Sequence, residues 1–123
     1  MFRTIPFAAL IALSACNMTQ EVDGSELFAA NCSGCHGTDG KGNAEMKVAL
    51  GRDIPDLTQI AARNGGTFDH DAVMSQIDGL HRKEGSPMPE FGDDDLGPIV
   101  MVGSTPIPAE LLALSGYLES IQE

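Results

Sequence analysis

The chain has 123 residues, the size of one domain, and carries 18 acidic but only 7 basic side chains, for a formal charge of −11. This charge excludes nucleic acid as a partner, because phosphates repel an acidic surface. It favours an encounter with redox proteins that present a basic docking patch, although an acidic surface also keeps an exported protein in solution.

Residues 1–15 have the pattern of an export signal, with Arg3 followed by an apolar run too short for the roughly 20 residues that a bilayer requires. The run ends in Leu-Ser-Ala-Cys at Cys16, which resembles the lipobox of bacterial lipoproteins. The resemblance implies an acylated Cys16, a tether over 16–23, and attachment to a membrane on the periplasmic side of the bacterial cell envelope. The alternative is an ordinary secretory signal that leaves Cys16 as a free thiol.

Residues 24–123 are expected to form one folded domain. Its first helix begins after Asp23, whose carboxylate can cap it, and runs into a C-x-x-C-H sequence at Cys32, Cys35 and His36. This is the spacing by which a chain holds a haem covalently. Two sulfurs on one side of a short turn can add to the two vinyl groups of one haem, and the histidine that follows can bind its iron.

A C-x-x-C pair also occurs in thioredoxin-like redox sites and in structural zinc sites. The first usually follows a strand in a βαβ pattern, which this sequence lacks. The second needs four ligands at paired spacings, whereas His70 and His81 lie far apart and no second cysteine pair exists. Haem attachment uses two of the three cysteines and the lipid uses the third.

The residues around this motif resemble those of class I cytochromes c. In that family a glycine, an aromatic residue and the first haem cysteine recur at helical spacing, as Gly24, Phe28 and Cys32 do here. Leu114 and Tyr117 match the leucine and the aromatic residue of the family's last helix. The resemblance implies an all-α class I cytochrome c fold, with crossing N- and C-terminal helices and one covalent haem c in the core.

After a glycine-rich loop, residues 43–54 show no regular pattern, and Arg52 within them would either pair with a haem propionate or remain a solvated charge. Pro55 lies in an Ile-Pro-Asp-Leu sequence that resembles the family's Pro-x-Leu element. The resemblance implies that the Pro55 carbonyl accepts a hydrogen bond from Nδ1 of His36 and orients the ring. The alternative is a plain turn before a helix.

Apolar spacing predicts two helices in the middle of the chain. The first lies within residues 57–66 and ends at Asn-Gly-Gly. The second is capped by Thr67 or Asp69 and presents one apolar face, made of Val73, Ile77 and Leu80. His70 and His81 flank it among charged residues and are expected to be surface histidines.

Residues 85–92 contain a Pro-Met-Pro-Glu-Phe sequence that resembles the loop by which class I cytochromes c bring a methionine sulfur to the second haem face. The resemblance implies that Met88 binds iron opposite His36 and that Phe91 packs against the porphyrin. A thioether favours Fe(II) and raises the potential. Met101, which also lies downstream, is the main alternative.

The C-terminal part begins with an acidic cluster, Asp93 to Asp95, that lacks the EF-hand pattern and is expected to be a solvated turn or a partner-facing patch. Residues 96–107 should form a small hairpin or a wrapping loop. Pro108 opens the last helix, whose apolar stripe consists of Leu111, Leu114, Leu118 and Ile121.

These features predict a membrane-tethered one-electron carrier with haem c ligated by His36 and Met88, and no enzymatic activity. No arrangement of nucleophile and base, or of paired carboxylates, suggests substrate chemistry. One alternative is a haem with an open or labile sixth site that senses a small ligand or acts like a peroxidase. Another is a structural lipoprotein in which the C-x-x-C-H sequence is incidental.

Overall fold

The structure is a computed structural model that describes residues 21–123. The predicted export signal over 1–15, the lipid site at Cys16 and most of the tether over 16–23 lie outside the described residues. Within residues 21–123, no helix is both long and apolar enough to cross a membrane. Export and lipidation therefore stay predictions.

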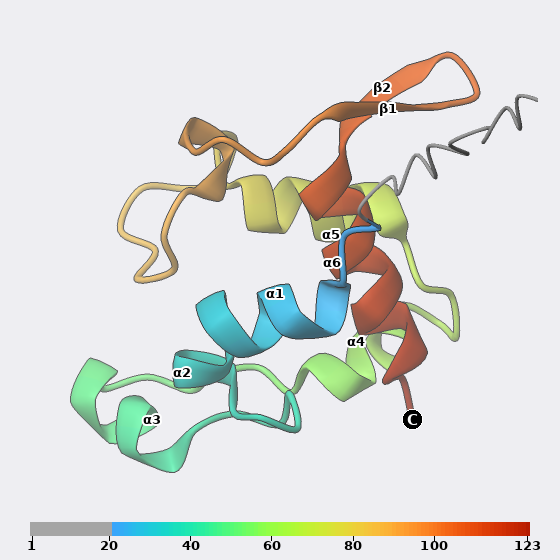
Figure 1. Cartoon of the computed structure of the whole chain (residues 1–123). Helices are drawn as coiled ribbons and strands as arrows, with labels where there is room; N and C mark the ends of the chain where they lie inside the picture. Colours follow the sequence, from blue (N-terminus) through green and yellow to red (C-terminus); the bar gives the residue numbers. More distant parts are fainter. Residues whose placement is uncertain (1–20) are drawn as a thin grey trace, which may run out of the picture.

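The described chain is mostly helical (Figure 1). In chain order its elements are α1 (Gly24–Asn31), α2 (Ser33–His36), α3 (Ala44–Leu50), the 3-10 helix η1 (Leu57–Gln59), α4 (Ile60–Arg63), α5 (His70–Asp78), the 3-10 helix η2 (Phe91–Asp93), β1 (Ile99–Val102), β2 (Thr105–Pro108) and α6 (Ala109–Ser120). β1 and β2 form an antiparallel hairpin in which Ile99 pairs with Pro108. The all-α prediction therefore holds as a mostly helical domain to which one small hairpin is added.

Helices α1 and α6 pack directly against each other. Gly24 is buried at this contact, and a Cβ at its position would overlap the carbonyl oxygen of Ala113. One turn further along α1, the ring centroid of Phe28 lies 5.2 Å from that of Tyr117. A residue without a Cβ is needed at this position, because it leaves room for the neighbouring backbone.

Helix α5 also packs against α6, and the three helices enclose the apolar core. The buried members of this core are Phe28, Val73, Met74, Ile77, Ile107, Leu111, Leu114 and Leu118. The prediction that Leu80 belongs to the buried face of α5 is wrong. The helix ends at Asp78, Gly79 adopts a left-handed conformation with φ 79°, and Leu80 beyond it is exposed.

His70, at the start of α5, is more than a surface histidine. Its Nδ1 lies 2.8 Å from Oγ of Ser115 on α6, and Ser115 is completely buried. Its Nε2 lies 3.2 Å from the carboxylate of Glu119. His70 therefore joins α5 to α6, whereas His81 is exposed as predicted.

Helix α3 occupies a segment in which the sequence predicts no regular structure. The Asn43 side chain caps it by accepting hydrogen bonds from the N–H groups of Glu45 and Met46, and Gly51 ends it in a left-handed conformation. None of its residues is buried. Apolar periodicity depends on a buried face, so it could not reveal this helix.

Candidate functional site

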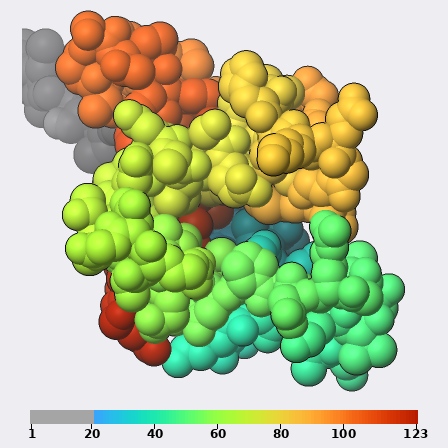
Figure 2. All heavy atoms as spheres, turned by 180° about the vertical axis from the view of Figure 1, so that it is seen from behind, coloured from blue at the N-terminus to red at the C-terminus, as the bar shows by residue number. Residues whose placement is uncertain are grey.

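A pocket opens between three parts of the fold: the end of α1 with α2, the segment 50–55, and the loop 86–91 beside α5. Figure 2 shows it as a hollow in the surface, with α1 and α6 visible at its bottom. The pocket consists of an outer hollow of about 220 Å³ and an inner hollow of about 120 Å³. They share the lining residues Cys32, His36, Pro55, Gln76 and Met88. The inner hollow also borders the apolar core, so the pocket extends from the surface to the core.

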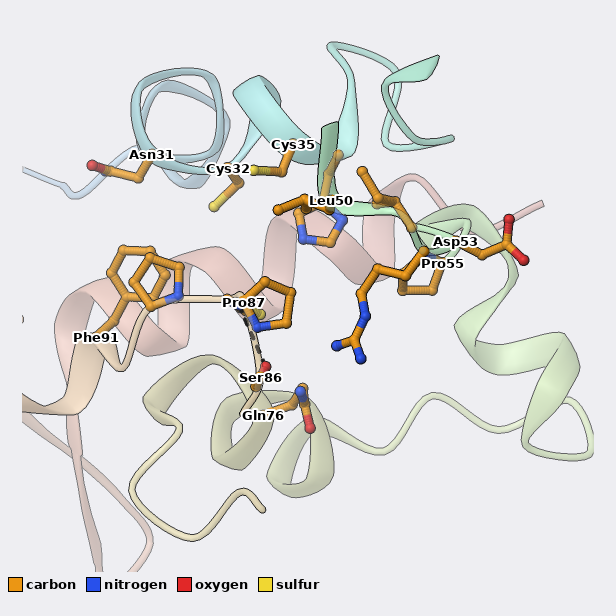
Figure 3. A pocket seen from close by; sticks show the side chains of 15 residues that line it. Asn31, Cys32, Cys35, Leu50, Asp53, Pro55, Gln76, Ser86, Pro87 and Phe91 are labelled. Atoms are coloured by element: carbon orange, nitrogen blue, oxygen red, sulfur yellow. Dashed lines mark hydrogen bonds between the residues drawn. The ribbon is translucent and has the colours of Figure 1, made fainter. Parts of the chain in front are cut away.

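One side of the pocket, which we call the cysteine wall, consists of residues 32–36. Cys32 and Cys35 are half-buried free thiols that line the pocket, and Figure 3 shows both side chains extending from this wall. The N–H groups of Cys35 and His36 both donate to the Cys32 carbonyl, over 3.2 and 2.9 Å. This helical turn brings both sulfurs to the same side. Burial, and to a smaller extent the nearby Cys35, raises the pKa of the Cys32 thiol.

His36 is the last residue of α2 and lines both hollows. Its carbonyl accepts a hydrogen bond of 2.7 Å from the N–H of Gly42, where the glycine-rich loop returns to the cysteine wall. Burial lowers the pKa of His36, which favours the neutral imidazole. Neutral imidazole is the form that binds metals. Burial therefore favours the form of His36 that an iron ligand requires.

Pro55 lines both hollows together with His36, as predicted, but the predicted hydrogen bond between them is not formed. Nδ1 of His36 is buried and has no hydrogen-bond partner among the described residues. A hydrogen bond needs both a short distance and a near-linear approach. The shared pocket brings Pro55 near the ring without meeting both conditions, so the motif predicted the neighbourhood of Pro55 and not its bonding.

The facing side of the pocket, which we call the methionine wall, is the loop 86–91. Met88 lines both hollows and packs against the apolar core. Phe91 lines the outer hollow, and Figure 3 shows its ring across the pocket from Cys32. Met101 lies on β1, is 59% exposed and lines neither hollow. The structure therefore brings Met88, and not Met101, opposite the cysteine wall.

Arg82 and Ser86 hold the methionine wall, and sequence reasoning did not single them out. Nη1 of Arg82 donates to the Met88 carbonyl over 3.0 Å, and Nη2 donates to the Pro89 carbonyl over 2.6 Å. The N–H of Met88 donates to Oγ of Ser86 over 3.4 Å, a bond drawn as a dashed line in Figure 3. The only signal in the sequence is a basic residue shortly before the methionine loop, which is too common to be specific.

The other charged candidates lie at the surface. Arg52 lines the outer hollow with an exposed side chain, and the three aspartates 93–95 are exposed. The carboxylate of Asp95 accepts a hydrogen bond of 3.1 Å from the N–H of Gly97. In the part of the chain that the structure describes, no three His, Cys, Asp or Glu side chains gather as a metal ion requires.

The family model for cytochrome c matches residues 21–122, which include both walls of the pocket. The chain belongs to the cytochrome c family. No curated protein and no solved structure matches it. Membership of the cytochrome c family implies covalently attached haem c and supports a general role as a haem-binding electron carrier.

The pocket residues of this cytochrome fit a haem. Two free thiols lie on one wall, a neutral imidazole lies beside them, and the facing wall carries a thioether. The inner hollow is lined mostly by apolar side chains, which suits an apolar macrocycle.

Proposed function

We propose that this cytochrome transfers single electrons through one haem c, which Cys32 and Cys35 bind covalently and His36 and Met88 ligate from opposite faces. One observation carries the proposal. All four side chains line a single pocket, although the cysteine wall and Met88 are far apart in the sequence. When bound, the haem supplies an iron that changes between Fe(III) and Fe(II).

The residues of the chain have separate tasks in this proposal. The thiols of Cys32 and Cys35 would hold the haem through two thioether bonds, each formed by addition of S–H across one vinyl group so that no atom is lost. His36 offers a neutral nitrogen and Met88 a neutral sulfur, a pair that raises the potential. Phe91, which packs against the apolar core, would contact the macrocycle, and Pro55 would lie beside His36.

We further propose a lipid anchor at Cys16 and a location on the periplasmic side of a bacterial membrane. The lipobox-like sequence before Cys16 supports this anchor, and two or more acyl chains bind a bilayer stably where one does not. The formal charge of −11 supports a redox partner with a basic docking patch, because opposite charges accelerate the encounter.

An absorption spectrum of the matured protein tests the axial ligands. We expect a six-coordinate low-spin haem with the weak far-red band of an iron–thioether bond. Met88→Ala should abolish this band, whereas Met101→Ala should preserve it, because Met101 is exposed on the hairpin outside the pocket. A five-coordinate high-spin spectrum of the wild type would contradict the carrier and favour the alternative of an open sixth site.

Fractionation of cells that produce the full chain tests the anchor. We expect the wild type in the membrane fraction and Cys16→Ser in the soluble fraction, with the same haem spectrum in both. Release of the wild type by salt alone would argue against a lipid, since charge screening does not weaken the burial of acyl chains.

A further inference from the structure

We propose that Arg82 is a positioning residue that pins the backbone of the methionine wall and so keeps the Met88 sulfur at the haem iron. This inference rests on the proposed ligation by Met88. Arg82 lies outside the Pro-Met-Pro-Glu-Phe sequence. Its hydrogen bonds would determine whether Met88 is held firmly at the iron or is displaced easily.

The contacts of Arg82 converge on the ligand loop. Its Nη1 donates to the carbonyl of Met88 over 3.0 Å and to Oγ of Ser86 over 2.8 Å. Its Nη2 donates to the carbonyl of Pro89 over 2.6 Å. A guanidinium presents its donors in a rigid planar fork, and hydrogen bonds from a charged donor are stronger than those between neutral groups. One side chain therefore fixes two consecutive carbonyls, including that of Met88 itself.

The loop has little else to hold its backbone. Between Ser86 and Glu90, the described chain forms no hydrogen bond from main chain to main chain. Pro87 and Pro89 have no N–H to donate. The remaining hydrogen bond of the ligand residue runs from the N–H of Met88 to Oγ of Ser86, which Arg82 also contacts. The polar anchoring of the loop thus depends on Arg82 directly or through Ser86.

Arg82 is itself held in place by the end of α5. Its N–H donates to the carbonyl of Gly79 over 3.1 Å. A Cβ at Gly79 would overlap the guanidinium, so the glycine leaves the space that the side chain fills. Nε of Arg82 is buried and has no partner among the described residues, which shows how closely the side chain is packed. A cation just beyond the C-terminus of a helix also interacts favourably with the helix dipole.

The side chain and the backbone of the loop thus have separate roles. The thioether of Met88 supplies the sulfur, and the two fixed carbonyls hold the backbone from which the Met88 side chain extends. When the guanidinium is removed, the loop loses its charged donors and the sulfur leaves the iron more often. An external ligand such as imidazole, which must displace the methionine, then binds to the ferric protein more tightly.

Imidazole titration of the matured ferric protein tests the inference. Arg82→Gln should raise imidazole affinity about tenfold or more and weaken the far-red thioether band, as expected for the loss of two charge-assisted hydrogen bonds. The imidazole affinity of Arg82→Lys should lie between those of Arg82→Gln and the wild type, because an ammonium lacks the planar fork. Arg63→Gln is the matched control: its Nη1 also donates to a backbone carbonyl, that of Asp56 over 2.8 Å, but Arg63 does not line the pocket.

Ser86→Ala gives a second test if Arg82→Gln does not mature. It removes an acceptor of Arg82 and the partner of the Met88 N–H, and a smaller rise in imidazole affinity is expected. Wild-type imidazole affinity and an unchanged band in both Arg82→Gln and Ser86→Ala would overturn the inference. If the wild type itself lacks the band, the ligation by Met88 fails instead.

Discussion

The two walls of the pocket are built in different ways. The cysteine wall is held by its own backbone, since Cys35 and His36 donate to the Cys32 carbonyl and the carbonyls of Cys35 and His36 accept hydrogen bonds from the returning glycine-rich loop. The methionine wall forms no such bonds between Ser86 and Glu90 and depends on a guanidinium from outside the loop. The proposed ligand His36 is thus placed by local structure, and the proposed ligand Met88 by a side chain outside its loop.

The difference shows where ligation can be changed without loss of the haem. A change in the cysteine wall removes the bonds that fix the cofactor to the chain. A change around the methionine wall leaves those bonds intact and alters only how firmly the second ligand is held. We therefore expect substitutions near the cysteines to act on haem content, and those near Met88 to act on the spectrum and on exchange with external ligands.

The largest effect is expected for the double substitution Cys32→Ser/Cys35→Ser. Without the two thiols, no covalent bond to haem can form, so acid–organic extraction should remove all haem from the protein. Mass spectrometry of the extracted chain measures the outcome. Cys16→Ser, which changes the third cysteine, should keep its haem. Haem that stays bound to the double variant would contradict the assignment of the cysteine wall.

The next largest effect is expected for Gly24→Val, which disturbs the helix that leads into the cysteine wall. Its side chain would overlap Ala113 of α6, and overpacking of this kind costs about 1–3 kcal/mol, occasionally more. Urea unfolding measures the free energy of unfolding. Gly116→Ala is the control, because nothing lies within 4 Å of its Cβ position and alanine favours a helix by up to about 1 kcal/mol. Equal losses in both variants would argue against the close contact of α1 and α6.

A smaller effect is expected for Ser115→Ala, which acts on α5, the helix that supports the methionine wall. The substitution removes the 2.8 Å contact between Ser115 and Nδ1 of His70, at a cost of about 0.5–1.5 kcal/mol, because the half-buried ring nitrogen can still reach water. Thermal unfolding of the wild type and of Ser115→Ala measures this loss of stability. Ser75→Ala, at an exposed position of α5 where the side chain forms no hydrogen bond among the described residues, should stay within about 0.5 kcal/mol of wild type.

The smallest effect concerns acid stability near Pro55. The hydroxyl of Thr58 donates to Asp56 over 2.6 Å, and this hydrogen bond holds the pKa of the carboxyl below its usual value of 3.8. The unfolded chain therefore binds the proton first, and the stabilisation is present above pH 3.8 and lost as pH falls through the lower folded pKa. Asp56→Asn should flatten the decline of Tm with acidification. Asp71→Asn, on the exposed side of α5, should leave this decline unchanged. Identical slopes of Tm against pH in the wild type and both variants would refute the effect.

Much of the core was accessible from sequence because its signals are local. The family resemblance of Gly24 and Phe28 implied a packing of the first helix against the last, and the stripe of Leu111, Leu114 and Leu118 predicted the buried face of that last helix. Helix α3 was missed, because its signals are a cap and a left-handed glycine at its ends and it has no buried face. Leu80 was misplaced, because an apolar pattern continued past the glycine that ends α5.

The sequence by itself determined the chemistry of this cytochrome: two thiols and an imidazole at haem spacing, and a methionine between prolines. Residue types and short spacings are enough for this, because one helical turn places Cys32, Cys35 and His36 together. Only the tertiary structure decided that Met88 lies in the same pocket, that Pro55 does not bond His36, and that Arg82 donates hydrogen bonds to the carbonyls of Met88 and Pro89. These three findings depend on side-chain directions and on distances between residues that do not belong to one short motif. No local sequence pattern contains that information.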